Sequence, residues 1–189
     1  MTTRCRTPRP ASVPTFPSAI LLATLVAVAF APDLVAQERT ISAEALEIAE
    51  ALAGAKRDHL WRIAIWGGAN VALGVGLLAG GSRDDTPTRF GFGVQSTAWG
   101  AINLGIAGVS FLGGSPEVPT TLSGAISAEN GWADVLLLNL GLNVGYMGVG
   151  TALAIASGRG LSRGDEVRGH ALGVIAQGAG LFIFDGIAW

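Results

Sequence analysis

Charged residues are scarce in this chain of 189 residues. Only 14% of it is Asp, Glu, Lys or Arg, whereas 50% is hydrophobic, and the formal net charge is −2. A soluble domain has about a quarter of its residues charged. The deficit excludes a disordered chain, which is rich in charge, and a nucleic-acid-binding protein, which needs a basic face. It also disfavours a water-soluble globular fold.

Cysteine and histidine are almost absent as well. Cys5 is the only cysteine, and His59 and His170 are the only histidines. A single thiol cannot form a disulfide within the chain, and two histidines so far apart give no ligand pattern for zinc or haem. No P-loop and no HExxH motif occurs. We therefore expect no metal, no cofactor and no enzymatic activity.

The first 36 residues have the pattern of a secretory signal peptide. Three arginines precede an apolar run at residues 19–31, and Ala36 offers a small residue for cleavage. A basic start, a short apolar core and a small residue at the cut define such a segment. The run is too short to span a membrane core of about 30 Å comfortably. We predict cleavage after Ala36; the alternative is an uncleaved membrane anchor.

Residues 37–59 predict an extracytoplasmic amphipathic helix. Ser42 suits the N-cap position, and Glu44 favours the first turn of a helix. Apolar residues follow at three- and four-residue steps, which places them on one face: Ile41, Ala45, Ile48, Leu52 and Ala55. Such a helix lies at the membrane surface or leads into the first span; the alternative is a helix that docks a partner.

Residues 60–189 contain four apolar stretches of membrane-spanning length. They lie at about 61–80, 91–113, 133–156 and 170–189, and polar or breaker-rich loops separate them. A helix rises about 1.5 Å per residue, so each stretch can cross a bilayer. The predicted fold class is therefore all-α: an integral membrane bundle of four transmembrane helices, preceded by a signal peptide and an amphipathic helix.

The loops differ in basic residues, which predicts the orientation. The loop at 81–89 has two arginines, the loop at 113–131 has no basic residue, and the loop at 157–168 has three arginines. Because loops rich in Lys and Arg stay in the cytoplasm, the first and third loops should be cytoplasmic. The expected location is the bacterial inner membrane, multi-pass, with both termini extracytoplasmic after signal cleavage.

Glycine is abundant, at 28 residues, and much of it falls in small-x-x-x-small pairs. The pairs are Gly76/Gly80, Ala101/Gly105, Gly141/Gly145, Gly169/Gly173 and Ala176/Gly180. Such pairs let helix backbones approach closely in lipid. They favour a compact bundle, without indicating which face meets which.

Each predicted span carries a carboxamide at a similar depth, near the membrane midplane. The first two spans share a Trp-Gly-x-x-Asn pattern, and the third places polar residues at the same kind of spacing. The candidate intramembrane polar site comprises Asn70, Asn103, Asn139, Asn143, Tyr146 and Gln177. These side chains either hydrogen-bond across helices as packing or form a ligand or ion site.

Three charged residues lie closer to the outer surface. They are Arg62, Asp134 and Asp185, and the matched depth of Arg62 and Asp185 predicts an ion pair, with Asp134 as the other candidate partner. Asp185 is the only acid well inside a predicted span. Because ionisable groups in a membrane are costly and often functional, Asp185 is the first candidate for a functional role.

Two motifs carry a resemblance to a known family. They are Asn139-x-Gly141-Leu142-Asn143-x-x-Tyr146 and Gln177-Gly178-x-x-Leu181-x-x-x-Asp185. In combination they resemble a family of uncharacterised bacterial four-helix membrane proteins, over about residues 60–189. The resemblance implies a membrane location and no agreed activity. An Asp commonly stands in that family at the position of Asn143, so a charge-dependent role there is in doubt for this chain.

These observations lead to two functional hypotheses. The first is a non-enzymatic bacterial inner-membrane protein of structural or accessory type, surrounded by the lipid bilayer and contacting a membrane-protein partner or a second copy. The alternative is a small oligomeric carrier, or a ligand- or ion-binding membrane protein, that uses the Asn/Gln layer near the midplane. Four spans are few for a carrier, so the alternative requires a homo-oligomer.

Overall fold

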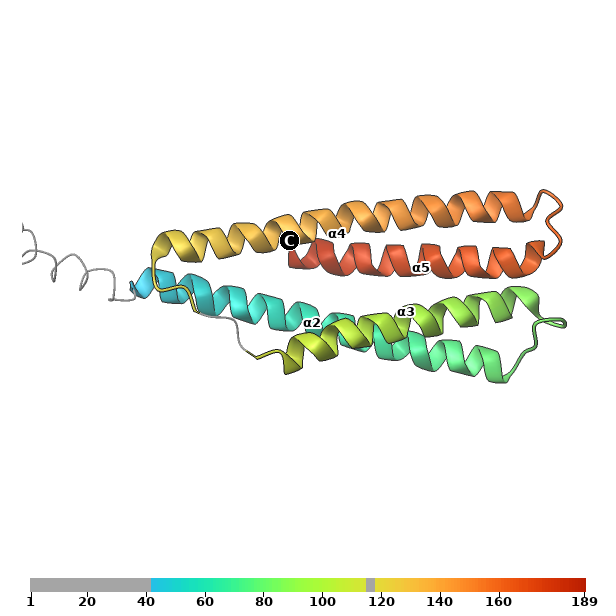
Figure 1. Ribbon diagram of the computed structural model, residues 1–189, viewed down its shortest axis with the longest axis horizontal. Helices are drawn as coiled ribbons and strands as arrows, with labels where there is room; N and C mark the ends of the chain where they lie inside the picture. Colours follow the sequence, from blue (N-terminus) through green and yellow to red (C-terminus); the bar gives the residue numbers. More distant parts are fainter. Residues whose placement is uncertain (1–41, 115–117) are drawn as a thin grey trace, which may run out of the picture. The chain divides into compact units, whose positions relative to one another are not determined.

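Helices make up almost all of the chain that the computed structural model describes, which is residues 42–114 and 118–189 (Figure 1). The predicted signal peptide lies outside these residues. The described helices are α2, Ala43–Ala79; α3, Pro87–Leu112; α4, Leu122–Ser157; and α5, Gly164–Ala188. The all-α prediction is confirmed for this part of the chain.

Three of these helices, α2, α4 and α5, are long and apolar enough to cross a membrane. The fourth predicted span corresponds to α3, which does not meet the same criterion. Its length of 26 residues would suffice. The composition of α3 explains its lower hydropathy, because its apolar stretch contains Gln95, Ser96, Thr97 and Asn103.

Two helices are longer than the sequence indicates. Residues 43–79 form one continuous helix, so the predicted amphipathic helix and the first span are parts of α2. Helix α4 begins at Leu122 rather than near residue 133. In both helices a side-chain hydroxyl caps the first turn: Ser42 Oγ accepts from the Ala45 N–H at 3.0 Å, and Thr121 Oγ1 from the Gly124 N–H at 3.2 Å.

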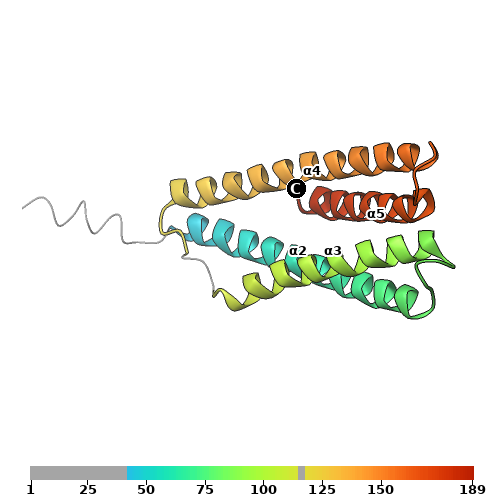
Figure 2. The same cartoon turned by 45° about the vertical axis from the view of Figure 1, so that its right-hand side comes forward.

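The helices pack as two neighbouring hairpins, α2 with α3 and α4 with α5 (Figures 1 and 2). Helix α5 also packs on α3, and α2 contacts both α4 and α5. The links at 80–86 and 158–163 lie at one end, which we call the loop end. At the other end α2 and α4 continue past α3 and α5. We call this extension, residues 43–60 of α2 and 122–135 of α4, the arm.

Glycine permits the closest approaches between helices. A Cβ atom on Gly100 would lie 2.6 Å from the Gly67 carbonyl oxygen, and one on Gly74 would lie 2.6 Å from that of Gly93. These four residues, spaced seven apart in α2 and in α3, were not among the predicted pairs. Of the predicted ones, Gly169/Gly173 faces α3, whereas Gly141/Gly145 has no atom within 4 Å.

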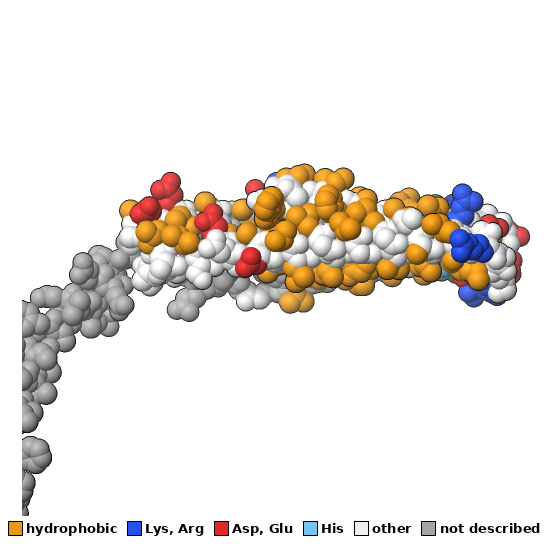
Figure 3. All heavy atoms as spheres, turned by 90° about the horizontal axis from the view of Figure 1, so that it is seen from above, with side chains coloured by type: hydrophobic (Ala, Val, Ile, Leu, Met, Phe, Trp, Pro, Cys, Tyr) orange, Lys and Arg blue, Asp and Glu red, His pale blue; other side chains and the backbone are white. Residues whose placement is uncertain are grey.

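The surface between the two ends is apolar. Large side chains such as Ile65 and Val109 are 68% and 73% exposed. Figure 3 shows hydrophobic side chains along the middle of the visible face, with Lys and Arg gathered at one end and most of the acids toward the other. A wide apolar surface of this kind indicates contact with lipid or with another protein. The described helices therefore suggest a membrane protein.

Candidate functional site

A first polar cluster joins α2 to α5 inside the bundle. The Trp66 indole N–H donates to Gln177 Oε1 at 3.0 Å, and Gln177 Nε2 donates to Asn70 Oδ1. Asn70 Nδ2 in turn donates to the Trp66 carbonyl oxygen at 2.8 Å. Both oxygens and both amide groups of the two carboxamides thus have a partner. Asn70 and Gln177 cross-link two helices directly.

The other predicted midplane residues do not join this cluster. Asn103 is buried, and its Nδ2 has no hydrogen-bond partner among the described residues. The Tyr146 ring packs edge-on against Trp99 at 5.1 Å between centroids, which links α4 to α3. Asn139 is half-buried on α4. The six predicted residues therefore divide among several contacts and do not converge on one site.

A second polar cluster surrounds Asp185, nearer the arm. Asn143 Nδ2 donates to Asp185 Oδ2 at 2.7 Å, and His59 Nε2 lies 3.2 Å from Asp185 Oδ1. His59 is 6% exposed, and Asn143 and Asp185 are each 3% exposed. One carboxylate thus connects α2, α4 and α5 in the bundle interior. Because ionisable groups are expensive there, this cluster is the strongest candidate site.

The predicted ion pair of Arg62 with Asp185 is not found. Arg62 is half-buried, Asp134 is exposed, and neither forms a salt bridge with the described residues. The reason is the helix face: the buried residues of α2 recur at four- and three-residue steps, as His59, Ile63, Gly67, Asn70 and Gly74. Arg62 lies off this stripe, whereas His59 lies on it.

Two ring nitrogens beside this cluster have no hydrogen-bond partner among the described residues. They are Nδ1 of His59 and Nε1 of Trp132, and both atoms are buried. The two rings meet edge to face, with centroids 5.5 Å apart. Buried polar atoms without a protein partner are uncommon and are usually satisfied by an ordered water.

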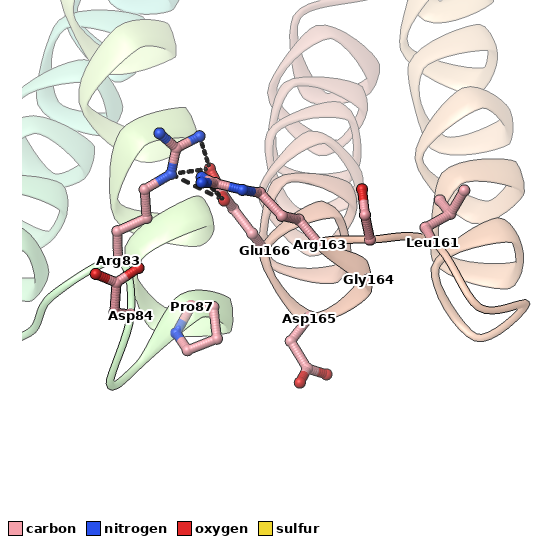
Figure 4. A pocket seen from close by; sticks show the side chains of 9 residues that line it. Arg83, Asp84, Pro87, Leu161, Arg163, Gly164, Asp165 and Glu166 are labelled. Atoms are coloured by element: carbon pink, nitrogen blue, oxygen red, sulfur yellow. Dashed lines mark hydrogen bonds and ion pairs between the residues drawn. The ribbon is translucent and has the colours of Figure 1, made fainter.

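A third cluster lies at the loop end, where sequence reasoning placed no site (Figure 4). Glu166 is buried in the first turn of α5 and binds Arg83 through two nitrogens, at 2.9 and 2.7 Å. Arg163 adds a contact at 3.2 Å, and His170 Nε2 lies 3.9 Å away. The hydrogen bond to Glu166 raises the pKa of the Arg83 guanidinium. The signal that the sequence offered for this cluster was an acid near the start of α5 together with arginines in the first loop.

The loop-end cluster lines an open hollow of about 460 Å³. Its charged lining combines Arg83 and Arg163 with Asp84, Asp165 and Glu166. The charges of the arginines are thus balanced by acids, and both arginines already form ion pairs with Glu166. This arrangement ties the two links together and leaves no excess positive charge for an anion.

One sequence pattern in the last link invites a catalytic interpretation. Residues 160–164 read Gly-Leu-Ser-Arg-Gly and match the letters of a nucleophile elbow. That elbow requires a strand before the serine, whereas Ser162 lies in the link after α4 and Gly164 is the first residue of α5. Among the described residues Ser162 forms no hydrogen bond with a histidine. The geometry gives the pattern no support as an acyl-transfer site.

Within the described ranges, no group of three or more His, Cys, Asp or Glu side chains could hold a metal ion. A second hollow, of about 430 Å³, lies in the arm between α2 and α4. Neither hollow is lined by the carboxamides of the bundle interior. The interior clusters and the hollows are therefore separate features.

Fold and site together define an all-helical protein with helices that could cross a membrane and with polar cross-links in its interior. The pattern of a family of unknown function, DUF6992, matches residues 62–186, and the chain belongs to this family. The match agrees with the predicted resemblance to an uncharacterised family over a similar range. No curated protein and no solved structure matches the chain.

Replacing Glu166 by Ala should lower the melting temperature of the detergent-solubilised protein. The change removes the shared partner of Arg83 and Arg163, whose side chains are 52% and 56% exposed. Because solvent and salt screen such pairs, the fall should be modest and should shrink between low and high salt. Thermal unfolding at two salt concentrations measures it; a loss independent of salt would contradict an electrostatic role.

Proposed function

We propose that this protein is a non-enzymatic bacterial inner-membrane protein of structural or accessory type. The observation that carries the proposal is the direct pairing of Gln177 with Asn70 and Trp66, and of Asp185 with Asn143 and His59. Carboxamides that bind each other across helices stabilise a membrane bundle modestly and fix its register. A carrier would instead keep its polar groups available to a substrate.

The alternative, a small oligomeric carrier or ion-binding protein, has less support. Its site was to be the Asn/Gln layer, yet the described partners of Gln177 and Asn70 are protein groups. The buried Asp185 carboxylate is the feature that favours this alternative. A test must therefore ask whether water reaches the interior.

Cysteine labelling in bacterial spheroplasts tests the proposal, in a background with Cys5→Ser. Single cysteines replace Glu47 and Ser127 on the arm, Ser162 at the loop end, and Asn103 and Gln177 in the interior; the first three are exposed and the last two buried. We expect an impermeant maleimide to label the arm cysteines in intact spheroplasts and Ser162→Cys only after permeabilisation.

The interior cysteines separate the two hypotheses. A structural interior should leave Asn103→Cys and Gln177→Cys unreactive toward a small methanethiosulfonate until the protein is denatured. Rapid reaction in intact spheroplasts would indicate a water-filled path and favour the carrier. Labelling of Ser162→Cys from outside would contradict the proposed orientation.

A further inference from the structure

We propose that the arm binds a basic amphipathic segment of a partner protein, with the apolar side of that segment in the hollow between α2 and α4. The hollow has a volume of about 430 Å³, within the range of about 300–1,000 Å³ typical of binding pockets. The inference rests on the proposed function in one respect: it takes the arm to project from the membrane.

The hollow is mostly apolar and partly aromatic, with Glu129 and Asn130 as the polar part of its lining. Ala51, Leu52 and Ala55 of α2 form one side, and Trp132, Ala133 and Leu136 of α4 form the other. Leu136 is fully buried beneath it, and the Trp189 side chain, 70% exposed, lies at its edge. Small residues opposite aromatic ones leave room for large side chains of a guest. Fully desolvated apolar anchors of this kind dominate the energy of helix-in-groove binding.

The charges around the hollow define the guest. The acids of the arm are Glu44, Glu47, Glu50, Asp58, Glu129 and Asp134, and its bases are Lys56 and Arg57. Glu129 lines the hollow, and Glu47 lies one helical turn before Ala51, on the same side of α2. Lys56 lies over the Trp132 ring, 5.6 Å from its centroid. An excess of carboxylates around an apolar floor suits Lys and Arg flanking apolar residues.

Charge also argues against two other occupants. A second copy of the chain would bring its own acidic arm, and like charges facing each other oppose association. An anionic membrane surface likewise attracts basic segments and repels acidic ones. A basic segment of another protein is the occupant that complements both the hollow and its rim.

The test measures binding of a synthetic peptide to the full chain in phosphatidylcholine nanodiscs. The probe is a fluorescent 18-residue amphipathic helix of Leu and Lys, its control is the same helix with Glu for Lys, and empty nanodiscs correct for binding to lipid. We expect the Lys peptide to bind and the Glu peptide not to bind. Raising the salt concentration should weaken binding several-fold.

Matched variants locate the site. Glu47→Gln with Glu129→Gln should raise the Kd of the Lys peptide about fivefold, and Ala133→Trp, which fills the hollow without changing charge, should weaken binding as well. Asp84→Asn with Asp165→Asn removes two acids at the loop end and should leave the Kd unchanged.

Three results would overturn the inference. They are binding no greater than to empty nanodiscs, equal weakening by the arm and loop-end variants, and self-association of the chain that Ala133→Trp abolishes, which would assign the hollow to a second copy. Failure here is distinguishable from failure of the proposed function. If the arm cysteines label from outside, the proposed function still stands even when no peptide binds.

Discussion

Replacing Asp185 by Ala should lower the free energy of unfolding by about 3 kcal/mol, because removing one member of a buried polar cluster leaves its partners without a hydrogen bond. Asp185 accepts from Asn143 and faces His59, and all three side chains are buried. The truncation therefore removes the one group that links α2, α4 and α5 at this level. Unfolding by SDS in mixed micelles, followed by helical circular dichroism, measures the loss.

Two variants control for this result. Arg62→Ala removes the residue that the sequence favoured as the partner of Asp185, and it should change the free energy of unfolding by less than about 0.5 kcal/mol. His59→Ala combined with Asp185→Ala should cost less than the sum of the single changes, because the two side chains share one interaction. Strict additivity, together with a large cost for Arg62→Ala, would show that the arginine is the true partner.

Gly100→Ala is the second change with a large expected effect. The added Cβ would lie 2.6 Å from the Gly67 carbonyl oxygen and 2.7 Å from the Val71 nitrogen, both of them backbone atoms that cannot move without separating the helices. Overpacking of this kind costs about 2 kcal/mol or more. The same titration in mixed micelles measures the loss, and cross-linking of cysteines across α2 and α3 should report a wider separation.

Gly145→Ala is the matched control. It lies in the predicted Gly141/Gly145 pair, yet a Cβ there meets no atom within 4 Å. Its effect should be neutral or slightly stabilising, since alanine has the higher helix propensity. A large loss from Gly145→Ala would mean that this face of α4 packs on another chain, and that the stability of the bundle depends on an oligomer.

The periodicity and composition predict the helices, though not the full lengths of α2 and α4, and they predict carboxamides at depth along them. Asn70, Asn103, Asn143 and Gln177 are all buried, because each lies at the centre of an apolar stretch where only the bundle interior can accept a carboxamide. Depth along a helix can be counted from the sequence. That is why the sequence indicates the depth of these four carboxamides but not their partners.

The partners depend on the direction in which each side chain points, which depth does not give. Arg62 and His59 lie at similar depth, but about 60° apart around α2, and only His59 faces Asp185. The Glu166 cluster is not predictable for a related reason. Arg83 and Arg163 are loop residues whose positive charge indicates orientation, but the sequence does not show which acid they contact. Contacts between residues far apart in sequence follow from helix packing.

The modest hydropathy of α3 has a consequence for how the protein is assembled. In a membrane, the polar residues of α3 have to be covered by a neighbouring helix, because lipid offers them no hydrogen-bond partner. Helix α2 precedes it in the chain and meets it through Gly67 and Gly74, so α2 is the first neighbour that can cover α3. The face of α3 that carries Gly91 is covered by α5. Because α5 comes last in the chain, this face of α3 is the last to be covered during synthesis.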